Sequence, residues 1–191
     1  MMQALRDLKE YLQPFVPQIG ARQYNQPESD WDAYFMDIAL RTAYMSKDPS
    51  TMVGAVLVDP YRNPIATGFN GFARGVKDHP SRYNDRKFKY QAIVHAETNA
   101  IYNAARRGAP TDGCTLYLLA ANHSGLIWGG PPCGQCTSAV IQAGIAEVVS
   151  YATFSVPDRW RESLEIASEL LAEAGVFYRE LRPYSPRTVI K

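Results

Sequence analysis

The sequence predicts an α/β protein of three layers, α/β/α, in which helices cover both faces of a mixed five-stranded sheet. Segments with the apolar spacing of an amphipathic helix alternate with short apolar runs that are typical of buried strands. Glycine and proline residues separate these segments. With 191 residues, 46% of them hydrophobic and 20% charged, the chain has the size and composition of one globular domain.

The first predicted helix begins near Trp31 and ends near Met45. One of its faces carries residues at helical spacing: Trp31, Phe35, Ile38, Thr42 and Met45. Ser29 or Asp30 can cap it, because short polar side chains accept hydrogen bonds from the first N–H groups of a helix. Two strands, 53–58 and 65–69, then flank the segment 59–64, whose Asp, Asn and Pro residues are typical of a hairpin turn.

Helices and strands alternate through the rest of the chain. The expected elements are a helix from about Ala92 to Arg107, a strand at 115–120, a helix at 134–143, a strand at 146–151, a helix at 158–174 and a strand at 176–181. Gly108, Gly144 and Gly175 follow the three helices, and glycine is a usual helix stop. This element order favours one mixed sheet.

Composition limits the classes of partner. The formal net charge is +1, which argues against a nucleic-acid surface, because non-specific phosphate binding needs clustered Lys and Arg. The sequence holds no apolar run of 18 residues, and its first ten residues include Arg6, Asp7 and Lys9, so we expect neither a membrane span nor a signal peptide. An odd number of cysteines, three, does not make a disulfide framework. We therefore expect a cytoplasmic protein.

Three regions are expected along the chain. Residues 27–182 form the folded domain, 1–26 an N-terminal appendage and 183–191 a C-terminal tail. Within the appendage, Ala4–Tyr11 has the pattern of a short amphipathic helix, followed by Pro14 and Pro17. We expect this helix to pack on the domain or on a neighbouring subunit.

One constellation of residues points to chemistry. His95, Ala96 and Glu97 precede Asn99 and Ala100, and Pro132, Cys133 and Cys136 follow in the pattern P-C-x-x-C. Histidine nitrogen and cysteine thiolate are ligands that zinc prefers, and three such ligands leave the fourth tetrahedral position open for water. Glu97 lies two residues from His95, so it points away from the ligand direction and is free to carry protons.

Each part of this pattern has a simpler interpretation. His95 alone is more often a core or solvated histidine, and a lone C-x-x-C can be a redox or structural motif. Together, with helix and strand in the expected order between them, the residues favour a catalytic zinc centre. Cys114 is expected to be a small buried hydrophobe at the start of a strand, and His79 and His123 are expected to be loop residues.

With these motifs the chain resembles the cytidine and deoxycytidylate deaminase superfamily, and the deoxycytidylate (dCMP) deaminases in particular. The resemblance covers roughly Trp31 to Leu181, and four more segments carry it: Trp31–Met36, Ser46–Pro49, Val53–Ala55 and Gly68–Gly71. It implies a cytidine-deaminase-like fold, one catalytic Zn²⁺ per subunit and hydrolytic deamination of dCMP to dUMP with release of ammonia. In that reaction hydroxide attacks C4 of the cytosine, while Glu97 protonates N3 and passes a proton to the departing ammonia.

The resemblance also suggests substrate-binding residues. Asn70 matches an asparagine that hydrogen-bonds the sugar, although a turn asparagine beside glycines is the simpler interpretation. Ser46, Lys47 and Thr51 match groups near a 5′-phosphate, and Lys47 is otherwise a solvated lysine at a helix end. Ala96, between the histidine and the glutamate, is a further candidate contact.

Candidates for the pocket walls and for regulation are less specific. Tyr151 and Phe154 are candidates for a wall of the base pocket, or else core aromatics. Arg106 resembles a position that phage-type dCMP deaminases place near a subunit contact and regulatory site, or else it is a helix-end arginine favoured by the helix dipole.

The chain departs from the family pattern in three places. Many members carry extra Cys and His residues upstream for a second zinc, whereas here only His79 lies there. Residues 121–130 form an insertion before Pro131, and its Trp128 is a candidate lid or base contact, or else a packed or subunit-contacting residue. The charged segment 71–91 reaches toward a nucleotide phosphate or a dCTP or dTTP effector, or else is a solvated loop.

The leading prediction is thus a dCMP deaminase of pyrimidine deoxynucleotide metabolism that assembles as a homo-oligomer, a dimer or a hexamer. One alternative is a deaminase of C5-modified dCMP or of another cytosine nucleotide. Another is a deaminase of tRNA or single-stranded DNA, which needs a basic, aromatic groove that the near-neutral composition disfavours. The third is a zinc-binding protein without catalysis, and the presence of Glu97 argues against it.

Overall fold

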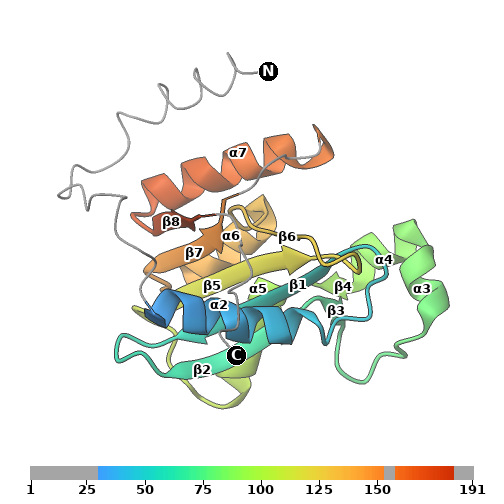
Figure 1. Ribbon diagram of the computed structural model, residues 1–191, viewed down its shortest axis with the longest axis horizontal. Coiled ribbons are helices and arrows are strands. Elements are labelled where there is room, and N and C mark those ends of the chain that lie inside the picture. Colours follow the sequence, from blue (N-terminus) through green and yellow to red (C-terminus); the bar gives the residue numbers. More distant parts are fainter. Residues whose placement is uncertain (1–29, 153–157, 183–191) are drawn as a thin grey trace, which may run out of the picture.

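Five strands form the main sheet in the order β2-β1-β5-β7-β8, and a short sixth strand, β6, pairs with the end of β5. The computed structural model, drawn in Figure 1, describes residues 30–152 and 158–182. The strands are β1 Met52–Val58, β2 Pro64–Phe69, β3 Gly71–Phe72, β4 Ile93–Val94, β5 Thr115–Ala121, β6 Ile127–Trp128, β7 Glu147–Tyr151 and β8 Phe177–Leu181. The helices are α2 Asp30–Ala43, α3 Pro80–Asn84, α4 Arg86–Ala92, α5 Ala96–Arg106, α6 Gly134–Gln142 and α7 Asp158–Glu173.

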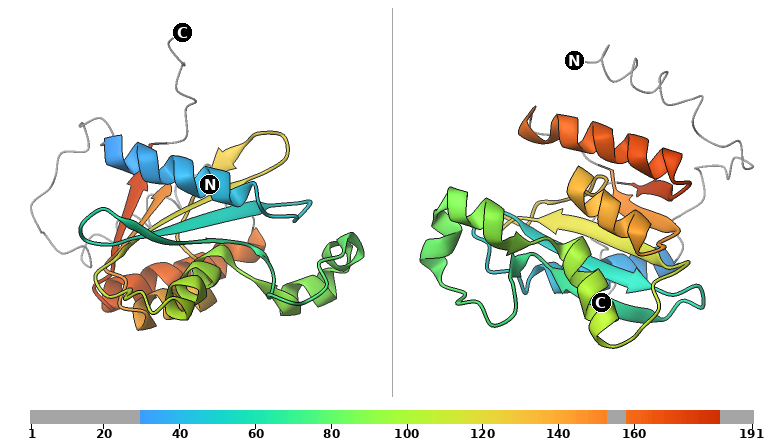
Figure 2. Two further views of the ribbon diagram at one scale, coloured as in Figure 1. Left: turned by 90° about the horizontal axis from the view of Figure 1, so that it is seen from below. Right: turned by 180° about the vertical axis from the view of Figure 1, so that it is seen from behind.

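The sheet is mixed, as predicted. β1 pairs antiparallel with both β2 and β5, and β5, β7 and β8 run parallel to one another. Helix α2 lies on one face, and α5, α6 and α7 lie on the other, which makes the three layers visible in Figure 2. The parallel half follows from helical crossovers, because parallel neighbours need a connection long enough to return across the sheet.

Each face of the sheet has its own core. On the α2 face, Phe35, Met36 and Ala39 pack against strand residues such as Val56 and Leu119. The other face is a second cluster, with α5 contributing three alanines: Ala96, Ala100 and Ala104. Small residues here allow close approach of helix and sheet. A Cβ atom on Gly68 of β2 would lie 2.2 Å from the Ala96 carbonyl oxygen, so only glycine lets the first turn of α5 rest on the sheet.

One predicted helix is divided in the structure. The sequence predicts a single helix from about Ala92, but α4 ends there, Ile93 and Val94 pair with β3, and α5 begins at Ala96. The β-branched pair Ile93 and Val94 suits an extended backbone. The backbone therefore changes direction directly before His95, which leaves this residue at the helix start.

The charged segment 71–91 is more ordered than the predicted loop. It contains α3 and α4, and the side chain of Asp85 caps α4 by accepting a hydrogen bond from the Phe88 N–H group. The predicted appendage 1–26, with its Ala4–Tyr11 helix, lies outside the described residues, as do the cap candidate Ser29 and the tail 183–191. Within the described part of the chain, no helix is both long and apolar enough to cross a lipid bilayer.

Candidate metal centre

The predicted metal ligands come together where α5 and α6 begin. His95 is the residue directly before α5, one position ahead of the first turn in which the sequence placed it, and Cys133 has the same place before α6. Both residues are extended, with φ and ψ of −73° and 158° for His95 and −67° and 159° for Cys133. Neither side chain caps its own helix, so both are available to a ligand.

The distances within this group fit a tetrahedral metal site. The Nδ1 atom of His95 lies 3.4 Å from the sulfur of Cys133 and 3.3 Å from that of Cys136, and the three donor atoms lie within 4.8 Å of one another. Ligand atoms of a tetrahedral zinc ion bound by His and Cys are about 3.6 Å apart, given Zn–N and Zn–S bonds of about 2.1 and 2.3 Å. One nitrogen and two sulfurs at this spacing therefore fit zinc.

The electrostatics favour the thiolate form of Cys133. The pKa of the Cys133 thiol is well below its usual range, because its sulfur accepts hydrogen bonds from Cys136 and from the His95 ring. The same contact with Cys133 raises the pKa of His95. A thiolate is the form that binds metal, and the positive end of α6 stabilises it further.

Glu97 lies beside the ligand group without belonging to it. The residue is in the first turn of α5, and its side chain is only 5% exposed. Burial raises the pKa of its carboxyl group, while the neighbouring His95 acts in the opposite direction. A carboxyl group with a raised pKa can take and return a proton near neutral pH, which is what a general acid and base must do.

Hydrogen bonds join the candidate substrate-binding residue Asn70 to the loop that contains the other two candidates, Ser46 and Thr51. The Oδ1 atom of Asn70 accepts the Val53 N–H at 2.7 Å, and its Nδ2 donates to the Thr51 carbonyl at 2.9 Å and to Asp48 at 3.3 Å. Ser46 donates its hydroxyl to the Asn70 carbonyl at 2.8 Å. Asn70 is thus held in place with one lone pair of Oδ1 left for a further donor.

Asp48 is the centre of this loop, and sequence reasoning missed it. The carboxylate is 3% exposed, and it accepts hydrogen bonds from Lys89 at 2.7 Å and from the Ser50 hydroxyl at 2.7 Å. Lys47, the predicted phosphate group, instead pairs with Asp78 at 2.9 Å and is 66% exposed. The segment Ser46–Pro49 carried part of the family resemblance, but it did not single out Asp48, because its partners Lys89 and Asn70 are distant in sequence.

The predicted insertion 121–130 is a hairpin made by β5 and β6. Its turn is closed by Asn122, whose side chain accepts the N–H groups of Ser124 and Leu126. Trp128 pairs with Ala120, and paired residues share one face of a sheet. The neighbouring Ile127 packs into the α2-side core, so Trp128 faces the side of α5 and α6, where the metal ligands lie.

Four candidates remain, and three of them lie in the described part of the chain. Tyr151 is 5% exposed and packs into the α2-side core, on the face opposite the metal ligands. Phe154 lies outside the described residues. Arg106 is exposed in the last turn of α5, about 15 Å along the helix axis from His95. Ala96 is fully buried directly beside His95.

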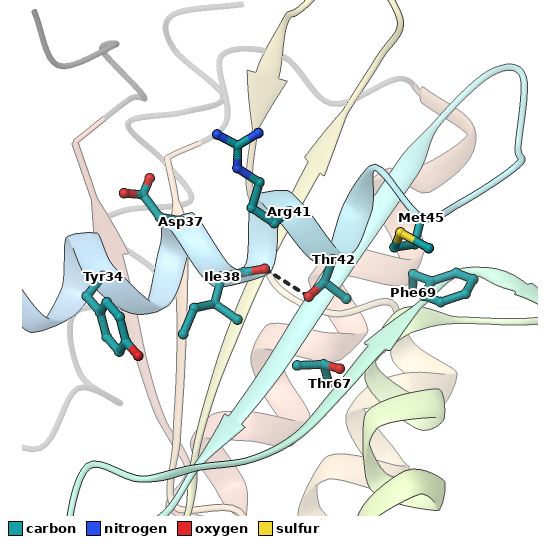
Figure 3. Close-up of a pocket in the computed structure, with 8 residues that line it drawn as sticks. All are labelled: Tyr34, Asp37, Ile38, Arg41, Thr42, Met45, Thr67 and Phe69. Atoms are coloured by element: carbon teal, nitrogen blue, oxygen red, sulfur yellow. Dashed lines mark hydrogen bonds between the residues drawn. The ribbon is translucent and has the colours of Figure 1, made fainter. Parts of the chain in front are cut away.

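Two hollows in the described surface are relevant to the site. The larger, about 420 Å³, lies on the outer side of α2 against β2, away from the metal ligands; Figure 3 shows its lining residues Tyr34, Asp37, Ile38, Arg41, Thr42, Met45, Thr67 and Phe69. The smaller, about 290 Å³, is lined by Pro49, Ser50, Tyr83, Asn84, Arg86, Lys89, Tyr90 and Arg159. The smaller hollow is lined in part by the loop that contains Asp48 and by α4, the helix that precedes His95.

The fold and the site together are those of the zinc-dependent deaminases. Comparison with known proteins gives the same class. Residues 29–152 match the family described as the cytidine and deoxycytidylate deaminase zinc-binding region, so the chain belongs to this family. Its cofactor is zinc, and His95, Cys133 and Cys136 are positioned to hold it.

Within this family, the chain is similar to deoxycytidylate deaminases. The chain is 34% identical to the deoxycytidylate deaminase of Mus musculus over 168 residues, which covers 84% of this chain and 85% of the relative. It is 33% identical to that of Homo sapiens over the same coverage. The dCMP deaminase of cyanophage S-TIM5, solved in complex with dCMP and dUMP, has the same fold, with a TM-score of 0.58, 20% identity and coverage of 82% of this chain and 100% of that one.

Proposed function

We propose that this chain catalyses the hydrolytic deamination of dCMP to dUMP and ammonia. The observation that carries the proposal is the buried carboxyl group of Glu97 beside three metal-binding side chains. The deoxycytidylate deaminases of Mus musculus and Homo sapiens, at 34% and 33% identity, support dCMP as the substrate.

The chain's own residues then divide the work. His95, Cys133 and Cys136 would hold the zinc ion, which would supply hydroxide near neutral pH by lowering the pKa of a bound water. Glu97 receives a proton from the water, protonates N3 of the cytosine and delivers a proton to the leaving amino group. One water is consumed and one ammonia is released, and the base keeps the water oxygen at C4.

The substrate residues remain part of the proposal. We assign the free lone pair of Asn70 Oδ1 to a sugar hydroxyl, and the Ser46 to Thr51 loop to the sugar and phosphate side of the pocket. Ala96 lies under the base at the start of α5, and Trp128 closes the pocket from the β6 side. Tyr151 has no place in this assignment, because it packs on the opposite face of the sheet.

Assembly and regulation complete the proposal. A homo-oligomer, a dimer or a hexamer, is supported by the apolar hollow between α2 and β2, where Tyr34 and Met45 are 49% and 63% exposed beside an edge strand. A second copy of the chain is the proposed occupant. A dCTP or dTTP effector, with Arg106 near its site, and a cytoplasmic location are also proposed, with 27–182 as the deaminase domain.

The testing experiment is an activity assay on purified protein. Ammonia release and loss of cytosine absorbance are measured with dCMP, dCTP, deoxycytidine and cytidine, with and without added dCTP. We expect turnover confined to dCMP. If zinc-loaded protein turns over none of the four compounds, the proposal is contradicted. C5-modified dCMP and a polynucleotide are then the next substrates to test.

A further inference from the structure

The smaller hollow has the composition of an anion-binding site, and we name it the basic pocket. Its lining comes from three segments that are distant in the sequence: the loop at Pro49 and Ser50, the helices α3 and α4 with Tyr83 to Tyr90, and Arg159 in the first turn of α7. Three of its eight lining residues are cationic, namely Arg86, Lys89 and Arg159, and none of the eight is acidic.

Among the described residues, the ion pairs neutralise only part of the positive charge of the basic pocket. Lys89 is matched by Asp48, which lies 2.7 Å away. Arg86 donates to the neutral Tyr90 hydroxyl at 3.1 Å and lies over the Tyr90 ring. Arg86 and Arg159 thus add a surplus positive charge, and guanidinium groups suit the geometry of phosphate oxygens.

The basic pocket adjoins the metal centre. Lys89 lies six residues before His95, and Asp48 contacts both Lys89 and Asn70, the candidate sugar ligand. On the other side, Ser163 of α7 accepts the Gly134 N–H at 3.0 Å, directly after the ligand Cys133. Arg159 precedes Ser163 by about one turn of the same helix, so α7 carries it to this edge.

We propose that the basic pocket binds the 5′-phosphate of the nucleotide whose base reaches the metal centre, with Arg86 and Arg159 as its main ligands and Lys89 as a third. The proposal rests on the proposed function, since it takes the substrate to be a nucleoside monophosphate. It replaces Lys47 as the phosphate group, because the Lys47 ammonium is held by Asp78. The pocket then makes the enzyme selective for nucleotide over nucleoside.

The test compares Arg86→Gln, Arg159→Gln and the double variant with two matched controls. Lys87→Gln and Arg161→Gln remove exposed cations one and two positions away, outside the pocket lining. We expect each pocket variant to raise KM for dCMP about 10-fold and the double variant about 100-fold, since each removes a charge-assisted hydrogen bond. The value of kcat for dCMP stays within about twofold, because the phosphate contacts are the same in the bound substrate and in the transition state, and the controls stay at wild-type values.

Three outcomes decide the proposal. An unchanged KM for dCMP in the double variant overturns it while leaving the proposed function intact. A double variant that keeps its KM but loses its response to added dCTP also overturns it, because the pocket then belongs to an effector. If the wild type turns over no dCMP, binding of inorganic phosphate is followed by ³¹P NMR titration. Phosphate binding that the double variant loses supports the pocket although the proposed function has failed; no binding by the wild type overturns both.

Discussion

Two groups of ionisable side chains lie at opposite ends of the sheet, and they differ in how their charges are balanced. At the amino ends of β5 and β7, Arg179 makes two hydrogen bonds to Asp32, at 2.7 and 2.9 Å, and a third to Glu147 at 3.0 Å. Tyr117 donates to Asp32 at 2.8 Å. At the other end, Glu97 is buried beside metal ligands, and its pKa is raised.

The difference separates stability from chemistry. In the Arg179 group each charge faces an opposite one, so the group holds α2, β5, β7 and β8 together. In the metal centre the carboxyl group of Glu97 is desolvated and its proton affinity is raised, which suits proton transfer. A charged group that the fold pairs with an opposite charge therefore adds stability, whereas a buried carboxyl group beside metal ligands gains a raised proton affinity.

The largest expected effect is on catalysis and follows Glu97→Gln. The amide is close in shape to the carboxyl group but cannot transfer a proton, so we expect kcat for dCMP to fall by about 10³-fold or more. Zinc content, measured by plasma mass spectrometry, stays at the wild-type level, because Glu97 is not a ligand. Loss of zinc from this variant would show that the carboxylate has been assigned the wrong role.

The next effect is on stability and follows Arg179→Met. Removing the guanidinium deletes the ion pairs of Arg179 with Asp32 and Glu147. Breaking a fully buried pair costs about 3–5 kcal/mol, and we expect about 3 kcal/mol here because the Arg179 side chain is 28% exposed. Urea unfolding measures the loss, while kcat of the folded protein stays near the wild-type value. Arg161→Met is the matched control, because its pair with Asp158 is exposed and worth less than about 1 kcal/mol. Equal losses in the two variants would refute the special role of the Arg179 group.

A smaller effect with a pH dependence follows Asp48→Asn. Burial alone raises the pKa of Asp48, but hydrogen bonds from Lys89 and Ser50 outweigh it and lower the pKa below the ordinary value of 3.8. A carboxyl group with a lowered folded-state pKa contributes stability that is present above its unfolded pKa and is lost as the pH falls through the folded value.

We therefore expect wild type to exceed the Asp48→Asn variant by roughly 2 kcal/mol at pH 7, and this gap to shrink below about pH 4. Urea unfolding at a series of pH values measures it. A gap that is constant down to pH 2 would show that the ionised carboxylate of Asp48 contributes nothing.

The smallest effect follows Tyr117→Phe, which removes one hydrogen bond to Asp32 and leaves the Arg179 contacts in place. We expect a loss of about 1 kcal/mol in unfolding free energy and no change in kcat. A loss as large as that of Arg179→Met would mean that the hydroxyl, rather than the ion pairs, organises this end of the sheet.

Local patterns carried much of the fold and of the metal site. The helical spacing from Trp31 to Met45, the glycine stops and the alternation of helix and strand depend on neighbours a few residues apart, and the structure confirms the mixed sheet that they predict. Cys133 and Cys136 are adjacent on one helix start, so their spacing alone predicts a shared ligand.

The tertiary structure decided what depends on distant partners. The pairing of β3 with β4 divided the helix expected from Ala92, and it placed His95 before α5 rather than inside its first turn. Asp48 and Lys89 are 41 residues apart, and Asp32 and Arg179 are 147 apart. The sequence by itself thus determined the element types and the metal-binding chemistry, because both follow from short-range spacing. Which charges are neutralised, and which are left for a substrate, was decided by the packing of strands and helices that no local pattern encodes.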